Sequence, residues 1–310
     1  MTDFALHVTP QDAAEWRETA RAAEAAGFTS LLVADHPGSC VNPFVALAAA
    51  AAVTRTIRLG SYVVNAGVRE PMLLATDVAS LDLVSGGRAV LGLGAGHTPA
   101  EWAAVGRTRP GVGARVDRCI AVADATRRLL AGEEVTVETP ELSMRGARLE
   151  RPRPVQERVP LLIGGGNTRL LRWAGEHADL VGLSGLGRTL PDGHRHTVRW
   201  RLDQIDAQVA LVPDRPLEAL VQAVEVTDDA ERALDEMSRD SGLTADELLR
   251  TPFVLVGTED EILAAIAGHE QRWGITRYAV RRPALGRLTG VLARLRQSKG
   301  SFSTPSRNST

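Results

Sequence analysis

The chain has 310 residues and a formal net charge of −2, and 44% of its residues are hydrophobic. The length fits one α/β barrel of roughly 250 residues with insertions. No basic stripe is present, which argues against nucleic acid as a partner, because phosphate neutralisation needs clustered Lys and Arg. The single lysine, Lys299, lies in the Ser/Thr/Pro-rich tail, so Schiff-base chemistry of the aldolase or pyridoxal kind has no nucleophile in the folded part.

The ends of the chain and its cysteines predict a cytoplasmic protein. Met1-Thr2-Asp3 leads directly into a strand-like segment, without the basic and then apolar pattern of a secretion signal. Cys40 and Cys119 fit a reduced cytosol. The longest apolar stretch, Phe44–Val53, is about half as long as a membrane-spanning helix requires. We expect one barrel domain over residues 1–298 and a disordered tail over residues 299–310.

Short apolar runs alternate with helical patterns eight times, which is typical of parallel βαβ units. Eight helix-containing crossovers favour a closed (β/α)8 barrel, of the TIM-barrel type with insertions, over an open doubly wound sheet, which is the second choice. The expected strands lie near residues 3–8, 30–36, 57–65, 89–95, 160–165, 179–184, 217–226 and 276–280.

Two helices carry clear end signals. Thr9-Pro10-Gln11-Asp12 predicts a cap, a proline at the first helical position and an acid in the first turn, and Gly27 predicts the end of that helix. Thr258 and Glu261 form a capping-box pattern before the last strand, and Gly274 ends that helix.

The Ala-rich helix Phe44–Val53 has apolar residues on every side, which predicts a second buried face and a homodimer packed there.

Two segments depart from the repeat, and a third connects a helix to the next strand. Residues 133–159 predict a small hairpin or ordered loop. Residues 185–198 form a glycine-rich loop after the sixth strand, on the face of a barrel where a mobile loop covers a ligand. Residues 211–216 are a short connection, which either opens the barrel mouth or removes a surface turn. These last two segments are expected to shape a substrate pocket.

Ionisable side chains follow the second strand. Asp35 and His36 come after Ser30–Val33, at the carboxyl end of a parallel strand, where barrels carry their catalytic groups. A histidine there can exchange a proton near neutral pH, with its tautomer fixed by a carboxylate. The alternative is that His36 caps the strand. His97 either touches a cofactor or begins a turn, and Glu101 and Trp102 are expected to anchor a short helix.

Glycine-rich segments, whose backbone amides are not covered by side chains, lie at the ends of two other strands. Gly164-Gly165-Gly166-Asn167 joins an apolar strand to a helix, so amide groups and the positive helix end can face an anion. Gly92-Leu93-Gly94-Ala95-Gly96 ends another strand. The strand at 57–65 carries Gly60, Ser61 and Tyr62 midway, which indicates either a ligand-facing bulge or a packing kink. Together these features predict a cofactor pocket.

A metal site is the weakest alternative. His194 and His196 are spaced as paired ligands, but no third ligand from a neighbouring strand end is evident. Two histidines in a polar loop are more often solvated.

Several motifs resemble the bacterial luciferase-like superfamily, and the similarity runs from about Phe4 to about Leu295. The segments that carry it are Glu24–Phe28, Val33–His36, Leu81–Arg88, Leu91–Gly96 and Pro160–Gly166. The single Asp-His after the second strand, with Val221–Val224 and Pro252–Thr258, is most similar to the branch that uses coenzyme F420, an 8-hydroxy-5-deazaflavin.

The resemblance implies a (β/α)8 barrel that holds the deazaflavin ring beside catalytic Asp35 and His36. It also implies a non-proline cis peptide behind the ring, in the segment Ser61-Tyr62-Val63. The residues that the resemblance places against the ring, the ribityl chain or the phosphate are Gly94, Gly96, Gly164, Gly165, Gly166, Asn167, Ser184 and Gly185.

The resulting hypothesis is an F420-dependent oxidoreductase that transfers a hydride between reduced deazaflavin and a small organic substrate with a C=C, C=N or C=O bond. The first alternative is an FMN-dependent luciferase-like monooxygenase. A third hypothesis, from another class, is a flavin-binding accessory protein without turnover, and a metal-dependent hydrolase comes last. The identity of the substrate does not follow from any motif in the chain.

Overall fold

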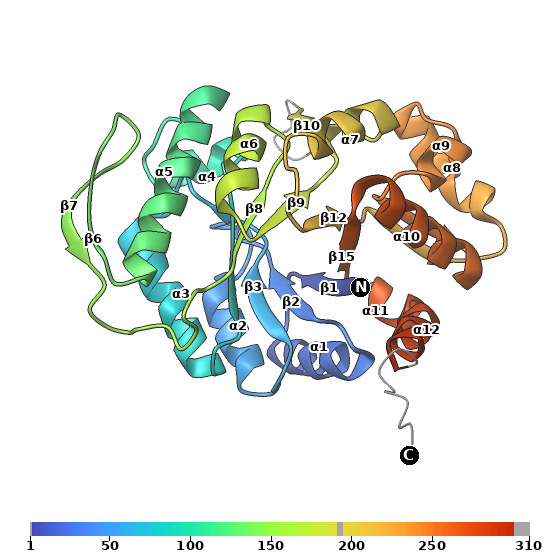
Figure 1. Cartoon of the computed structure of the whole chain (residues 1–310), viewed down its shortest axis with the longest axis horizontal. Helices are drawn as coiled ribbons and strands as arrows, with labels where there is room; N and C mark the ends of the chain where they lie inside the picture. Colours follow the sequence, from blue (N-terminus) through green and yellow to red (C-terminus); the bar gives the residue numbers. More distant parts are fainter. Residues whose placement is uncertain (1, 191–194, 301–310) are drawn as a thin grey trace, which may run out of the picture.

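The structure is a computed structural model that describes residues 2–190 and 195–300, and within them parallel strands close into a barrel surrounded by helices (Figure 1). The sheet has nine strands, of which β3 and β4 are two segments of one barrel position. In barrel order the strands are β1 (Asp3–Val8), β2 (Ser30–Val33), β3 (Arg58–Ser61) with β4 (Val64–Asn65), β5 (Ala89–Gly94), β8 (Leu161–Gly164), β9 (Leu180–Leu183), β12 (Leu217–Leu220) and β15 (Ile275–Arg281). Pairing of β3 with β5 and of β15 with β1 completes the ring. The predicted (β/α)8 barrel is confirmed, and the open sheet is wrong.

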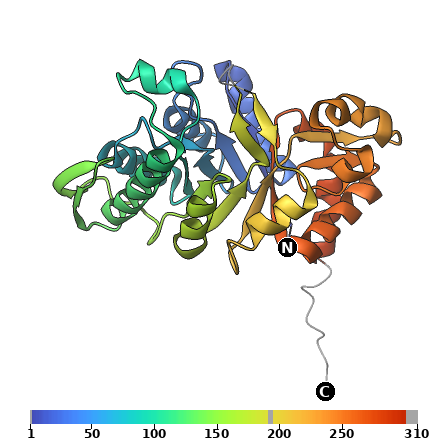
Figure 2. The ribbon, with the colours of Figure 1, turned by 90° about the horizontal axis from the view of Figure 1, so that it is seen from above.

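Helices surround the barrel between these strands (Figures 1 and 2). They are α1 (Ala13–Ala26), α2 (Pro43–Ala51), α3 (Pro71–Ser85), α4 (Pro99–Ala104), α5 (Val112–Leu130), α6 (Thr168–His177), α7 (Leu202–Val209), α8 (Ala230–Ser241), α9 (Ala245–Leu249), α10 (Glu259–Trp273), α11 (Ala284–Arg287) and α12 (Thr289–Gly300). None of the described helices is both long enough and apolar enough to cross a membrane.

The helix-end signals are confirmed at three of four places. Gly27 (φ 88°) and Gly274 (φ 67°) end α1 and α10 in the left-handed conformation, and Thr258 forms a capping box with Glu261. The start of α1 differs from the prediction. Asp12, not Thr9, is the cap, because its carboxylate accepts hydrogen bonds from the first free N–H groups, those of Ala14 and Glu15.

Alternation along the strands separates the two sides of the barrel wall. On β1, Phe4, Leu6 and Val8 belong to the large core between the strands and the helices. Ala5 instead packs inside the barrel in a small cluster with Leu32, Leu220 and Ala279. Because side chains two residues apart on a strand share a face, the next inward position on each strand lies one step nearer the barrel mouth.

The predicted strand 217–226 is wrong as a single element. Leu220 is the last barrel residue, and the chain then leaves the ring to form β13 (Ala223–Val226), which pairs in parallel with β14 (Val254–Gly257). The N–H of Gln222 donates to the carbonyl of Phe253, which directs the chain toward β14. Helices α8 and α9 lie between these two strands in the sequence.

The excursion at 133–159 is a hairpin, as predicted. Strands β6 (Glu134–Glu138) and β7 (Ser143–Arg148) are antiparallel and lie at the edge of the molecule in both views (Figures 1 and 2). The segment 185–198 also forms a hairpin, from β10 (Leu186–Thr189) and β11 (His196–Val198), where a loop was expected.

Parts of two predictions lie outside the described residues. They are His194 with residues 191–193 of the loop, and residues 301–310 of the tail. The described chain ends in α12, which extends to Gly300, one residue past the predicted start of the tail.

The short connection at 211–216 leads from α7 into β12. A helix-to-strand connection enters a parallel strand at its amino end, so it lies on the face opposite the barrel mouth. The alternative in which this segment opens the mouth is therefore wrong, and so is its predicted part in a substrate pocket.

Candidate active site at the barrel mouth

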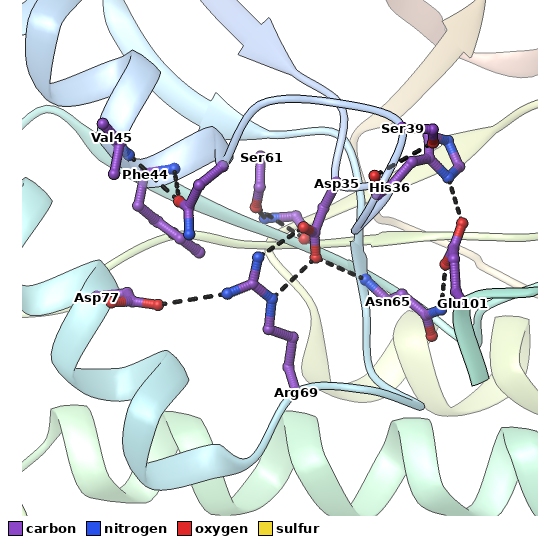
Figure 3. A network of polar contacts seen from close by, with 12 residues as sticks. Asp35, His36, Ser39, Phe44, Val45, Ser61, Asn65, Arg69, Asp77 and Glu101 are labelled. Carbon is purple, nitrogen blue, oxygen red and sulfur yellow. Dashed lines mark hydrogen bonds and ion pairs between the residues drawn. The ribbon is translucent and has the colours of Figure 1, made fainter. Parts of the chain in front are cut away.

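His36 is held by a carboxylate that comes from a different βα unit. Its Nδ1 lies 2.7 Å from Oε1 of Glu101, which is in the first turn of α4 (Figure 3). The other carboxylate oxygen of Glu101 accepts a hydrogen bond of 2.5 Å from Nδ2 of Asn65. Glu101 is buried, whereas the His36 side chain is 37% exposed, and its Nε2 makes no hydrogen bond with any described residue. The imidazole is thus fixed through Nδ1 and presents Nε2 outward.

The hydrogen bond favours the charged forms of both partners. The bond to Glu101 raises the pKa of His36 against the opposing effect of burial. Burial by itself raises the pKa of Glu101, but the hydrogen bonds from His36 and Asn65 outweigh it and the net pKa is lowered. The pair therefore favours an imidazolium next to a carboxylate.

Asp35 makes different contacts. Its carboxylate is buried and accepts hydrogen bonds from Arg69, 2.7 Å from Nη2 and 3.1 Å from Nε, with the backbone N–H of Asn65 at 3.4 Å (Figure 3). Arg69 also lies 3.7 Å from Asp77. These contacts hold the turn that carries His36, and a direct catalytic role of Asp35 stays a prediction.

The segment Ser61–Val63 forms the break between β3 and β4, and the Tyr62–Val63 peptide bond is cis, as the resemblance implies. Ser61 Oγ donates to the carbonyl of Gly92 at 2.9 Å and accepts from its N–H at 3.1 Å. Val63 lies so close to Gly94 that an added Cβ there would meet Val63 Cγ2 at 2.7 Å. Gly94 is thus required by the packing of the bulge itself.

Gly96 is also required by the protein's own packing. It has φ of 69°, and an added Cβ would lie 1.9 Å from Oδ1 of Asn65. The Asn65 that crowds Gly96 is the same residue that donates to Glu101, so the glycine allows the His36 network to form. Contacts of Gly94 or Gly96 with a cofactor stay predictions.

A polar cluster lies beneath the mouth. Tyr62 packs on the inner barrel cluster and hydrogen-bonds Glu218 of β12, a side chain that is 1% exposed. Burial raises the pKa of Glu218 to about 7, and the charge of Arg277 and the Tyr62 hydroxyl offset part of that effect. Burial, with the charges of Arg281 and His36, lowers the pKa of His7 to about 3. The floor of the barrel is therefore polar, and burial disfavours the charged forms of both His7 and Glu218.

The predicted anion cradle lies at the end of β8. Asn167 is the cap of α6, and its side chain accepts from the N–H groups of Arg169 and Leu170. Among the described residues no acceptor bonds the N–H of Gly166 or of Asn167, whereas the N–H of Gly165 donates to the carbonyl of Gly182. An added Cβ at Gly166 would meet nothing closer than 3.6 Å. Two amides at the positive end of a helix are thus open to an anion.

Arg199 adds a positive charge to this cradle, because its Nη1 donates to the carbonyl of Gly166 at 3.1 Å. Ser184 Oγ accepts from the N–H of Leu186. Gly185 is buried with φ of 65°, and an added Cβ would lie 2.5 Å from Trp200 Nε1. Gly185 thus accommodates Trp200, and contacts of Ser184 or Gly185 with a phosphate stay predictions.

The rings of His36, His97 and His196 contact one another in that order at the barrel mouth. His97 is 5.7 Å from His36 and 4.7 Å from His196 of β11, measured between ring centroids. Burial and the charges of its two neighbours lower the pKa of His97 to about 4, so it stays neutral at pH 7. No group of His, Cys, Asp or Glu that could hold a metal ion occurs among the described residues, and His194 lies outside them.

Glu101 and Arg199 are the site residues that sequence reasoning missed. Glu101 was expected only to anchor a short helix with Trp102, and that helix is confirmed, with Trp102 packed over Gly67. The available signal was a lone acid just after the Gly92–Gly96 strand end, at the same edge as His36. Arg199 carries no local signal, because it reaches Gly166 only through the β10–β11 hairpin.

The sequence is similar to those of known proteins. The family model described as luciferase-like monooxygenase matches residues 2–240. The chain is 31% identical over 179 residues to 5,10-methylenetetrahydromethanopterin reductase of Methanolobus tindarius, covering 57% of this chain and 52% of that protein. It is 30% identical over 238 residues to 4-hydroxyprotoasukamycin monooxygenase of Streptomyces nodosus subsp. asukaensis, covering 72% of this chain and 62% of that protein. The matched regions thus span between half and two thirds of these relatives.

A solved structure shows the same fold over nearly the whole chain. The coenzyme F420 dependent tetrahydromethanopterin reductase from Methanopyrus kandleri superposes with a TM-score of 0.73 and 17% identity, covering 95% of this chain and 99% of that one.

Proposed function

The chain belongs to the luciferase-like monooxygenase family, and on that premise we propose that it is an oxidoreductase dependent on coenzyme F420. In this proposal it transfers a hydride between the deazaflavin and a small organic substrate with a C=C, C=N or C=O bond. The observation that carries the proposal is the His36–Glu101 pair, an imidazole held by a buried carboxylate with its free nitrogen facing outward. Such a pair suits proton donation beside a hydride acceptor.

The residues at the mouth fit a phosphate-bearing ring cofactor. The open N–H groups of Gly166 and Asn167, with Arg199 beside them, would hold its phosphate. The bulge at Ser61–Val63 would support the ring from behind, and the buried polar side chains of Tyr62 and Glu218 would lie beneath it. When bound, the deazaflavin supplies or accepts the hydride.

The chain's own residues would handle the proton. Reduction of a C=X bond consumes one hydride and one proton, and the proton would leave Nε2 of His36. Glu101 would keep the Nδ1 proton in place and stabilise the imidazolium before the transfer, while Asn65 orients the carboxylate. Asp35 and Arg69 would hold the turn that aims the imidazole.

An FMN-dependent monooxygenase is the second candidate, and the identity to 4-hydroxyprotoasukamycin monooxygenase favours it. The proton-donating pair favours the F420 hypothesis, because a two-electron hydride transfer needs an acid at the acceptor. Titration of the apo-protein with F420 and with FMN, followed by fluorescence, separates these candidates. We expect a dissociation constant for F420 at least about tenfold below that for FMN, a difference of about 1.4 kcal/mol.

A non-catalytic flavin-binding role makes a different prediction for the same sample. In that case the bound cofactor would keep its oxidation state whichever hydride acceptor is added. We expect reduced F420 on the protein to be reoxidised when an activated alkene, imine or ketone is added under anaerobic conditions.

We also propose a homodimer through α2 and α3. These helices pack on each other and leave Val45, Leu73 and Val84 exposed to 70%, 66% and 62%. The other side of α2 is in the core, through Phe44 and Leu47. An apolar face of this kind on two adjacent helices is typical of a subunit interface, and the self-complementary packing of two copies would cover it.

A further inference from the structure

A pocket of about 270 Å³ lies beyond the carboxyl ends of β12 and β15, between β13, α8 and α11. Val224, Val256, Ala233 and Ala284 form its apolar wall, and Gln222, Glu225, Arg281 and Arg287 are its polar lining. A volume of this size suits a small organic group rather than a cofactor ring with its side chain.

Arg281 faces the barrel interior. In the register of β1 and β15 it pairs with His7, and Ala279, two residues earlier, belongs to the inner cluster. Because residues two apart share a face of a strand, the guanidinium leaves the sheet on the inner side. Its charge is among the causes that lower the pKa of His7. Arg281 Nη2 also donates to Gln222 Oε1 at 3.3 Å, which points it toward the pocket.

Neither arginine of the pocket has an acidic partner among the described residues. Arg287 Nη1 donates to the carbonyl of Val224 at 2.7 Å, and Arg281 bonds only the Gln222 amide. The neighbouring Arg282, by contrast, is paired with Glu15. Glu225 also lines the pocket, but no ion pair joins its carboxylate to either guanidinium. The pocket lining thus contains two guanidinium groups with spare N–H donors and one exposed carboxylate, that of Glu225.

This pocket is separate from the anion cradle at Gly166. In the ring of strands, β15 is next to β1 and two positions from β2, which carries His36. It is three positions from β8, where the cradle lies. An anion bound at Arg281 is therefore at a different part of the ring from the cradle. The loops after the seventh and eighth strands of such barrels are a frequent place for anion binding.

We propose that Arg281 and Arg287 bind a carboxylate group of the substrate in this pocket, so that the substrate is a small organic acid. Two planar guanidinium groups can each offer paired N–H donors to the two oxygens of a carboxylate. The reducible bond of the acid would then extend from the pocket toward His36. The substrate role rests on the proposed function, whereas anion binding by the pocket does not.

The test is binding of benzoate to the full-length protein without cofactor, measured by calorimetry, with benzamide as the uncharged analogue of the same shape. We expect saturable benzoate binding and at least tenfold weaker binding of benzamide. Arg281→Gln and Arg287→Gln are expected to weaken benzoate binding tenfold or more, because each variant loses a charge-assisted hydrogen bond to the carboxylate. Arg282→Gln is the matched control and should leave binding unchanged, because its partner is Glu15.

Equal binding of benzoate and benzamide would overturn the proposal, as would equal effects of the Arg281 and Arg282 variants. Absence of benzoate binding would also overturn it, and binding of inorganic phosphate in place of benzoate would reassign the pocket to phosphate esters. The F420 titration is a separate measurement on the same protein. A protein that binds benzoate but neither F420 nor FMN would retain the anion pocket and lose the proposed function.

Discussion

Replacing Glu101 by Gln tests the His36–Glu101 pair through its effect on stability at two pH values. The Gln side chain has nearly the shape of Glu and keeps one oxygen that can accept the hydrogen bond from Asn65. It lacks the negative charge that favours a protonated His36. A hydrogen bond between charged groups contributes about 1.5–3 kcal/mol. Because the His36 side chain is 37% exposed, screening by solvent reduces this to about 1 kcal/mol.

The sign of the pH dependence follows from both partners. The folded protein raises the pKa of His36, so the stabilisation is fully present below the ordinary histidine pKa and is lost as the pH rises through the raised value. The pKa of Glu101 is lowered, so its contribution is present above the ordinary carboxyl pKa and is lost as the pH falls through the lowered one. The pair is therefore most stabilising between about pH 5 and pH 6.

Thermal unfolding of Glu101→Gln at pH 5.5 and at pH 9 measures this difference. We expect a loss of about 2 °C in Tm at pH 5.5 and a smaller loss at pH 9, where a neutral imidazole accepts an N–H from the Gln amide. Glu133→Gln is the control, because Glu133 pairs with Arg128 and with no histidine, so its effect should be the same at both pH values. Equal losses for Glu101→Gln at the two pH values would refute the reasoning.

Three further predictions follow from the site and from the exposed helices. His36→Ala should lower turnover by about 10²–10⁴-fold while cofactor affinity measured by fluorescence stays unchanged, and a variant of full activity would exclude the proton-donor role. Gly94→Ala places a methyl group 2.7 Å from Val63 Cγ2, so chemical denaturation should show a loss of about 1–3 kcal/mol, and an unchanged midpoint would contradict the close packing of the bulge. Val45→Glu should convert a dimer to a monomer in light scattering, whereas a wild-type protein that is already monomeric at micromolar concentration would exclude the interface.

The barrel itself follows from local signals in the sequence. The barrel strands are short apolar runs, and helical segments alternate with them along the chain, so the order of elements can be read without tertiary information. The end of the 217–226 strand could not be read in this way. Residues 217–226 are compatible with strand throughout, and only the presence of β14 beside Gln222 diverts the chain from the barrel.

The site was predictable where one βα unit supplies it and unpredictable where two units meet. His36 and Gly166 each lie just after a strand, which is a local signal. Glu101 lies 65 residues from His36, and the two meet only because β2 and β5 end at the same edge of a closed barrel. Gly94 and Gly96 show a further limit, because a glycine required by Val63 or Asn65 has the same sequence signal as one required by a cofactor.

The central claim is that the open amides after β8 hold a phosphate and thereby place a redox ring against the His36 imidazole. A crystal structure of the protein with saturating F420 tests it most directly. The account predicts the cofactor phosphate within hydrogen-bond distance of the Gly166 and Asn167 amides, and the ring between the Ser61–Val63 bulge and His36. A phosphate bound elsewhere, or a barrel without a ring, would contradict it.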